Sequence, residues 1–358
     1  MMDKLILTIK TVSKTTKLSV HCNRKQIYLI NIKHPLDELC KFKSVIDQFE
    51  LRKHAVLEEL KRANIELSDI GIVVGRGGLL KPIPGGVYKV NEAMLKDIYH
   101  PMAEHESNLG GLIADAIAKE IGNDVIAVIV DPVCVDEMEP IAKISGMPEI
   151  TRRSFLHTLS QRAVAMRFAV AHGKTYDSVN VIVAHLGSGI SVGAHCKGKI
   201  IDVNNGLNGD GPMSPTRSGG VPVGQLVELC FSGKFTQEEM MKKICGNGGL
   251  KAYLRTGDAI EIEKRVTQGD TEAEIIYKAI TYQIAKEIGA LSTVLKGEVD
   301  GILLTGGLAH SQYIINEITE RVKHLGKIIV YPGENEMQAL ASNGYMVLND
   351  EIEVKEYV

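Results

Sequence analysis

The same order of predicted strands and helices occurs twice along the chain, and this repeat constrains the fold more than any other feature. Each copy begins with three short strands in succession, at about 4–32 and again at 179–203. Each continues with a helix, a strand that ends in paired glycines, a second helix and a last short strand. The two copies also share local sequence similarity, since HCNRKQI at His21 resembles HCKGKII at His195. The pattern predicts two similar α/β units that arose by duplication.

Helix and turn signals place the other elements. The helices are predicted from their apolar periodicity at about 37–64, 107–121, 271–296 and 311–324. Ser107 is the expected N-cap of the second of these helices, and Gly122 is its expected stop. The buried strands read DIGIVVG, VIAVIVDPV, DGILLTGG and KIIVYPG. An insertion rich in Gly and Asn occupies about 204–270, before the long helix of the second copy.

Two domains are expected, because a chain of 358 residues is long enough for two of ordinary size. The first is predicted at 1–155, completed by the C-terminal segment, and the second at 156–358. A cleft between such domains, lined by Gly-rich strand ends, is a common place for a small molecule to bind. The alternative is two generic α/β halves that resemble each other by chance, but five elements in a shared order favour duplication.

Composition excludes several classes of function. The net charge of −3 gives no electrostatic reason to bind nucleic acid or an anionic membrane. The longest apolar runs, such as Val125–Val130, are far too short to span a bilayer. The segment MMDKLILTIK has no signal-peptide pattern, and six scattered cysteines form no CxxC pair. A reduced cytoplasmic protein is expected.

Two glycine turns could bind a nucleotide. In AHLGSGIS, the turn Gly187-Ser188-Gly189 joins two strands, and its glycines would let backbone amides approach an anion. In LLTGGLAHS, Gly306 and Gly307 follow a buried strand and precede a helix, which suits a flat adenosine. Either motif alone is also compatible with an ordinary turn.

Four charged or titratable residues stand where they could serve chemistry. Arg76, Asp131 and Arg217 come at the ends of strands or turns, and a guanidinium there could bind a carboxylate or a phosphoryl group. Each could equally form a structural ion pair. His157, in RRSFLHTLS, could be a core histidine rather than a catalyst.

Taken together, the repeat and the glycine turns resemble the superfamily of sugar kinases, actin and heat-shock chaperones. The motifs GRGGLLKPIPGGVYKV, DPVCVDEMEPIAKISG, IDVNNGLNGDGP, FSGKFTQEEM and LTGGLAHS further resemble the butyrate kinases of the acetate kinase family, over nearly the whole chain. The resemblance implies an α/β fold of two duplicated ribonuclease H-like domains that face each other across a cleft, the second binding nucleotide. It also implies a homodimer or larger homo-oligomer.

The activity implied by this resemblance is reversible phosphoryl transfer between ATP and butanoate, which gives butanoyl phosphate and ADP with Mg²⁺ as cofactor. A carboxylate needs no strong base, so catalysis would rest on cationic side chains, Mg²⁺ and in-line positioning. Two alternatives remain. The chain could be a weak or regulatory paralogue, or it could act on a related acid such as isobutyrate or propionate.

The resemblance also implies roles for single residues. Arg76 matches the arginine that holds the carboxylate or the moving phosphoryl group, and Arg217 matches a second arginine clamp. Asp131 matches an acidic residue of the reaction centre, and His157 a histidine that steadies the transition state. Glu336, in PGENEMQALA, matches a glutamate associated with the metal.

Further matches concern the nucleotide. His185 and the turn Gly187–Gly189 correspond to the second phosphate loop, with Ser188 where close relatives often have Gly. Gly306 and Gly307 correspond to the adenosine turn.

The first phosphate loop departs from the family pattern INPGSTSTK, which reads IKTVSKTTK here. The residues that keep the pattern are Ser13, Thr15, Thr16 and Lys17. Lys10 replaces an asparagine and offers no oxygen to magnesium. Val12 replaces a glycine and tolerates a positive φ poorly, so the turn should follow a different path. Met337 stands where the family has a second glutamate.

Overall fold

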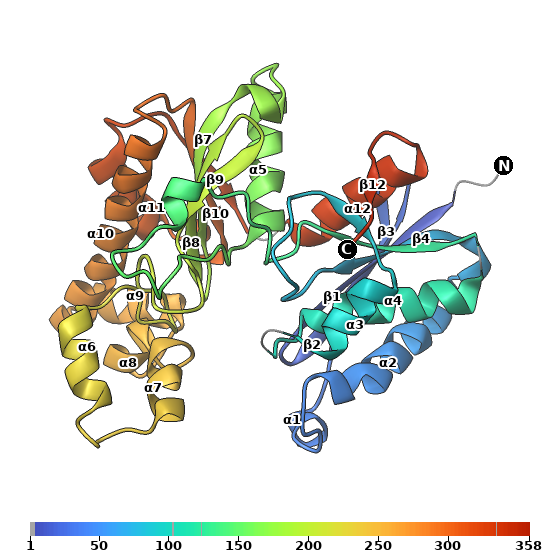
Figure 1. The fold of residues 1–358 in the computed structure, drawn as a ribbon, viewed down its shortest axis with the longest axis horizontal. Helices are drawn as coiled ribbons and strands as arrows, with labels where there is room; N and C mark the ends of the chain where they lie inside the picture. Colours follow the sequence, from blue (N-terminus) through green and yellow to red (C-terminus); the bar gives the residue numbers. More distant parts are fainter. Residues whose placement is uncertain (1–3, 102–103, 123, 334) are drawn as a thin grey trace. The chain divides into compact units, whose positions relative to one another are not determined.

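The chain forms two compact units (Figure 1). The structure, a computed structural model, describes residues 4–101, 104–122, 124–333 and 335–358. Unit 1 consists of Met1–Val135 together with Asn335–Val358, and unit 2 consists of Asp136–Glu334. The C-terminal segment therefore returns to the N-terminal unit.

The boundary expected at 155–156 falls inside unit 2 of this division. Residues 136–155 contact the second sheet directly. The Glu139 amide donates a hydrogen bond to the Ile201 carbonyl, and Arg152 forms a salt bridge with Asp202 at 3.0 Å. These contacts attach the connecting segment to unit 2.

Unit 1 is built on a seven-stranded sheet with the order β12-β5-β6-β4-β1-β2-β3. Its strands are β1 (Leu5–Val12), β2 (Thr15–Cys22), β3 (Lys25–Lys33), β4 (Ile70–Arg76), β5 (Val87–Lys89), β6 (Ile126–Val130) and β12 (Val354–Lys355). Its helices are α1 (Leu36–Leu39), α2 (Phe49–Arg62), α3 (Glu92–Tyr99), α4 (Asn108–Ile121) and α12 (Glu336–Leu348). The first three strands are antiparallel, whereas β4 runs parallel to both β1 and β6.

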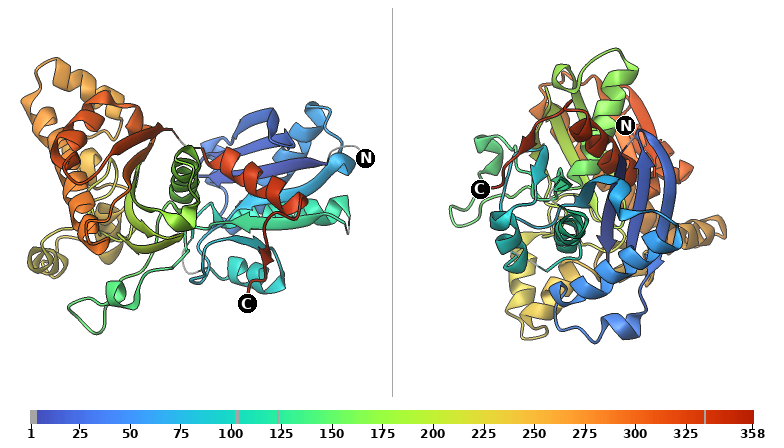
Figure 2. Two further views of the ribbon diagram at one scale, coloured as in Figure 1. Left: turned by 90° about the horizontal axis from the view of Figure 1, so that it is seen from above. Right: turned by 90° about the vertical axis from the view of Figure 1, so that its right-hand side faces the viewer.

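Helices cover both faces of this sheet, and the alternation of side chains along β4 shows which helix lies where. Gly75 faces Gly110 of α4, whereas the preceding Val74 faces Gly344 of α12. Because successive residues of a strand point to opposite faces, α4 and α12 lie on opposite sides (Figure 2).

Unit 2 is built on a five-stranded sheet with the order β11-β10-β7-β8-β9. Its strands are β7 (Asn180–Leu186), β8 (Ile190–Cys196), β9 (Lys199–Val203), β10 (Gly301–Gly306) and β11 (Ile328–Pro332). Its helices are α5 (Thr158–Ala171), α6 (Val223–Cys230), α7 (Gln237–Ile244), α8 (Gly249–Leu254), α9 (Ala259–Thr267), α10 (Thr271–Val294) and α11 (Gln312–Val322). Ile182 packs with α10 and α11 while Val183 packs with α5, so these helices cover opposite faces.

The two sheets repeat one order. In unit 1 the strands β3-β2-β1-β4-β6 are adjacent, and in unit 2 the strands β9-β8-β7-β10-β11 follow the same sequence of antiparallel and parallel pairings. The predicted repeat of three strands followed by parallel strands is therefore confirmed. The insertion forms α6 to α9. No helix in the described part of the chain has the length and apolar character needed to cross a membrane.

Two local predictions were wrong in detail. The long helix predicted at 37–64 is divided, because α1 ends at Leu39 and α2 begins only at Phe49. Ser107 occupies the N-cap position of α4, but its side chain does not cap the helix. Its hydroxyl instead bonds Nδ1 of His105 at 2.8 Å.

Candidate functional site

The predicted site residues of unit 1 line the carboxyl edge of its sheet. Arg76 ends β4, and Asp131 follows the end of the neighbouring strand β6. Lys10 lies near the end of β1 and is paired directly with Lys17 of β2. Since Gly75 is paired with Ile9, Arg76 and Lys10 are neighbours on adjacent strands. The fold thus gathers three cations and a carboxylate at one edge.

Glu336 joins this set from the first turn of α12. Its Oε2 lies 2.8 Å from Nζ of Lys10 and 3.4 Å from Nε of Arg76. The side chains of Lys10 and Glu336 are only 8% and 4% exposed. The positive end of the helix dipole also favours a carboxylate at this position. One buried carboxylate therefore contacts two cationic side chains.

The donor set around Glu336 fits a divalent metal poorly. Magnesium takes about six oxygen ligands, yet Lys10 offers only an ammonium and the neighbouring Met337 only a thioether. Among the described residues, no three His, Cys, Asp or Glu side chains are grouped so that they could hold a metal ion. Two side chains that contact the Glu336 carboxylate, Lys10 and Arg76, are thus cations, which cannot serve as metal ligands.

The first turn is a tight hairpin, in which Val12 of β1 is paired directly with Thr15 of β2. Val12 is part of the strand and does not adopt a positive φ, so its branched side chain is accommodated. Ser13 is exposed at the tip. Arg52 of α2, which is fully buried, donates hydrogen bonds to the carbonyls of Val12, Ser13 and Thr15 at 2.9 to 3.0 Å.

Arg52 was missed by sequence reasoning, although a signal for it exists. It occupies the same helical face as the buried residues Val56 and Leu60, at the spacing of a core position. An arginine at such a position needs hydrogen-bond acceptors inside the protein. The carbonyls of the first turn provide them.

Asp131 is buried and has the unusual φ of 40°. Aspartate is among the few residues that adopt this left-handed conformation readily. Its Oδ1 accepts a hydrogen bond from the Gly86 amide at 2.8 Å, and its own amide donates to the Gly86 carbonyl. The carboxylate is therefore held in one place at the edge of the sheet.

In unit 2, two predicted histidines are stacked. The ring centroids of His157 and His185 are 3.9 Å apart, with 10° between the ring planes. Nδ1 of His157 contacts the hydroxyl of Ser191 at 2.9 Å, and that hydroxyl also accepts from the Gln161 amide. Nδ1 of His185 contacts the hydroxyl of Ser160 at 2.9 Å. The Gln161 bond uses one lone pair of the Ser191 hydroxyl and leaves its proton available to Nδ1 of His157.

The turn Gly187–Gly189 lies beside these histidines and is fixed by the insertion. The hydroxyls of Ser214 and Thr216 donate to the Ser188 carbonyl at 2.7 and 3.1 Å. Arg217 packs so closely that a Cβ placed on Gly189 would lie 2.0 Å from its Nη1. This guanidinium also donates to the Gly206 carbonyl.

The pair Gly306 and Gly307 ends β10, and its two members differ. Gly306 has φ 92°, and a Cβ there would lie 2.4 Å from the Leu186 carbonyl oxygen. Gly307 has no heavy atom within 4 Å of its Cβ position. Gly306 is therefore required by the backbone, whereas Gly307 faces open space.

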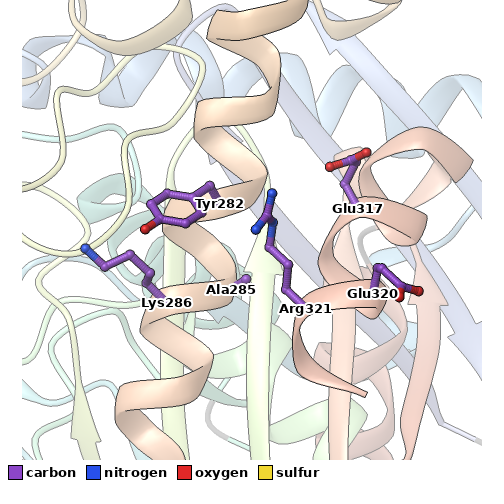
Figure 3. A pocket seen from close by; sticks show the side chains of 6 residues that line it. All are labelled: Tyr282, Ala285, Lys286, Glu317, Glu320 and Arg321. Carbon is purple, nitrogen blue, oxygen red and sulfur yellow. The ribbon is translucent and has the colours of Figure 1, made fainter. Parts of the chain in front are cut away.

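A shallow pocket elsewhere on unit 2 contains none of the predicted residues. It lies between α10 and α11 and is lined by Tyr282, Ala285, Lys286, Glu317, Glu320 and Arg321 (Figure 3). The guanidinium of Arg321 lies 5.1 Å from the ring centre of Tyr282. This pocket offers no glycine turn and no histidine, so it is not the candidate site.

Solved structures share the whole fold. Acetate kinase of Porphyromonas gingivalis superposes with a TM-score of 0.77 at 19% identity, over 96% of this chain and 100% of that one. A propionate kinase of Francisella tularensis gives 0.75 at 18% identity, over 95% and 98%. Acetate kinase of Entamoeba histolytica gives 0.75 at 16%, over 98% and 99%. At these identities the likeness shows the fold alone, and it confirms the expected fold class.

The sequence itself shows the family. The model of the acetokinase family matches residues 145–357, which is more than half of the chain. This stretch includes the stacked histidines, both glycine turns, Arg217 and Glu336. The chain belongs to the acetokinase family.

Proposed function

We propose that the protein is a butyrate kinase, which reversibly transfers a phosphoryl group between ATP and butanoate. The observation that carries this proposal is the cluster in unit 2, where His157 and His185 stack beside the turn Gly187–Gly189 and Arg217. Imidazole, guanidinium and backbone amide groups at one place suit the oxygens of a phosphoryl group. Membership of the acetokinase family supports a carboxylate as the acceptor.

The chemistry needs charge neutralisation more than a base. A carboxylate is ionised at neutral pH, so the main obstacle is repulsion between two anions. Arg217 beside the glycine turn and Arg76 at the sheet edge of unit 1 supply fixed positive charge. A proton on Nε2 of His157 would supply a donor for phosphoryl oxygen as charge develops. Magnesium that arrives with ATP would neutralise the phosphate chain.

The nucleotide has two proposed contacts. The open space at Gly307 suits the adenosine. A phosphate contact is also proposed for Ser13, Thr15 and Lys17 of the first turn, because they keep the family pattern of a phosphate loop; Ser13 is exposed, and Thr15 and Lys17 are partly buried.

Butanoate is proposed on the strength of the sequence motifs, since the solved relatives named above act on acetate and propionate. One methylene in an apolar pocket is worth about 1–3 kcal/mol, or roughly 10–200-fold in kcat/KM. Isobutyrate is the closest competitor. We also infer a homodimer or larger homo-oligomer, which light scattering would test.

The test is acyl phosphate formation, trapped with hydroxylamine, across acids from acetate to valerate and including isobutyrate. We expect the highest kcat/KM with butyrate. His157→Asn should lower turnover at least about 100-fold, and the matched variant His324→Asn, which changes an exposed histidine of the same unit, should not. A higher kcat/KM with another acid would reassign the substrate, and no acyl phosphate with any acid would refute a kinase.

A second candidate is a regulatory paralogue that binds nucleotide without efficient transfer. The contact between Lys10 and Glu336 favours the regulatory paralogue, because the Glu336 carboxylate, which the family associates with a metal, is paired here with an ammonium. Calorimetry with ADP separates the two. Nucleotide binding without acyl phosphate formation would support the paralogue.

A further inference from the structure

The buried contact between Lys10 and Glu336 assigns a function to both residues. We propose that the Lys10 ammonium is a built-in cation that takes the place of a divalent metal at Glu336. Magnesium would then reach the site only on the nucleotide. This inference rests on the proposed kinase function for its role in the reaction, but the occupancy of Glu336 can be tested without any turnover.

The geometry leaves little room for a second cation on this carboxylate. Nζ of Lys10 lies 2.8 Å from Oε2 of Glu336, and Nε of Arg76 lies 3.4 Å from the same oxygen. Magnesium binds oxygen at about 2.1 Å and requires near-octahedral ligands. An ion on Oε2 would have to displace Lys10 or lie against its ammonium in a site nearly closed to water.

The charge balance leads to the same conclusion. Lys10, Glu336 and Met337 together carry no net charge. A divalent ion added to them would leave two positive charges, with Arg76 adding a third and Asp131, at the same sheet edge, offsetting only one of them in a buried place. Uncompensated buried charge is strongly unfavourable. The existing ammonium therefore neutralises the carboxylate and disfavours a further cation.

The pairing also explains how two lysines can be cross-strand neighbours. Lys10 and Lys17 are paired directly on β1 and β2, where like charges repel. Glu336 neutralises Lys10. Lys17 forms no salt bridge with any residue that the structure describes, and it is only partly buried. Lys17 is then left to attract an anionic phosphoryl group, whereas Arg76 shares Glu336 with Lys10.

Binding of Mn²⁺ to the whole protein, measured by electron paramagnetic resonance without nucleotide, tests the proposal. We expect no Mn²⁺ binding by the native protein that depends on Glu336. Lys10→Asn should bind one Mn²⁺ at least about tenfold more tightly than the native protein, and Lys10→Asn with Glu336→Gln should lose that site. Lys278→Asn is the matched control, because Lys278 pairs with Glu274 on the exposed face of α10. It should gain no site.

Two results would overturn the inference. One is a Mn²⁺ site in the native protein that Glu336→Gln abolishes, and the other is the failure of folded Lys10→Asn to gain a site. Lys10→Gln serves the same purpose if the asparagine variant does not fold. Thermal unfolding of the native protein is a second readout, and exchanging magnesium for a chelator should not shift it. If Glu336 binds no metal and no acid is phosphorylated, the kinase proposal alone fails.

Discussion

His195 should make unit 2 sensitive to acid. The ring is fully buried in β8, where Nδ1 contacts the Tyr176 hydroxyl at 2.8 Å and Nε2 contacts Oε1 of Gln161 at 3.0 Å. Burial, and secondarily the positive charge of Arg162, lower the pKa of His195 to about 3. The folded protein therefore holds this histidine neutral.

The sign and size of the effect follow from linkage. Folding lowers the pKa of His195, so its ionisation costs no stability above the unfolded pKa of about 6.5. As the pH falls from there toward the folded pKa, the unfolded chain binds a proton that the folded protein does not, and the free energy of unfolding decreases. From pH 7 to pH 5 the loss attributable to His195 is about 2 kcal/mol. His34 in unit 1 acts in the same direction, because burial and Arg52 lower its pKa to about 4.

A variant separates the contribution of His195 from that of other groups. Wild type and His195→Gln are equilibrated in urea at pH 7 and at pH 5, and pulsed hydrogen exchange is read on peptides from β7 to β9. Each protein is compared with itself, so the packing lost in the variant cancels. The wild type should lose about 2 kcal/mol more than the variant between the two pH values. Equal losses would refute the reasoning.

Three further predictions concern the site. Gly307→Val should raise the KM for ATP at least about tenfold and leave the Tm unchanged, because its side chain enters open space. Gly306→Val should instead lower the Tm, because its side chain would meet the backbone. Equal effects of Gly307→Val on the KM for ATP and on the KM for the acid would indicate general misfolding. Arg76→Ala and Arg217→Ala should each raise the barrier to acyl phosphate formation by about 2–4 kcal/mol, and turnover near that of the wild type would remove the arginine from the site. Arg52→Met should destabilise unit 1 by about 3 kcal/mol, since it leaves the carbonyls of the first turn without their donor; unchanged urea unfolding of unit 1 would contradict this.

Local signals made much of the fold predictable. The groups of three strands and the strands that end in glycine pairs can be predicted from alternating apolar and polar residues and from the turn residues beside them in the sequence. The short strands β5 and β12 carry no such signal, because Val87 finds its partner Val354 near the other end of the chain. The insertion forms four helices that its Gly- and Asn-rich composition did not reveal.

The candidate site likewise contains residues that local sequence predicts and a contact that depends on tertiary packing. Arg76, Asp131 and the two glycine turns lie at strand ends, where a sequence pattern can place them. The contact of Lys10 with Glu336 joins opposite ends of the chain and depends on where α12 packs, which no local pattern reports.

The return of the C-terminal segment to unit 1 also sets an order of assembly during synthesis. Helix α12 seats Gly344 against β1 and β4, where a Cβ would lie 2.7 Å from the Ile6 side chain and 2.9 Å from that of Val74. The ribosome therefore releases every residue of unit 2 before unit 1 can be completed, although the strands of unit 1 are made first. Until α12 emerges, one face of the first sheet is uncovered and Lys10 has no Glu336. A premature stop before Asn335 would damage the part of the protein that was translated earliest.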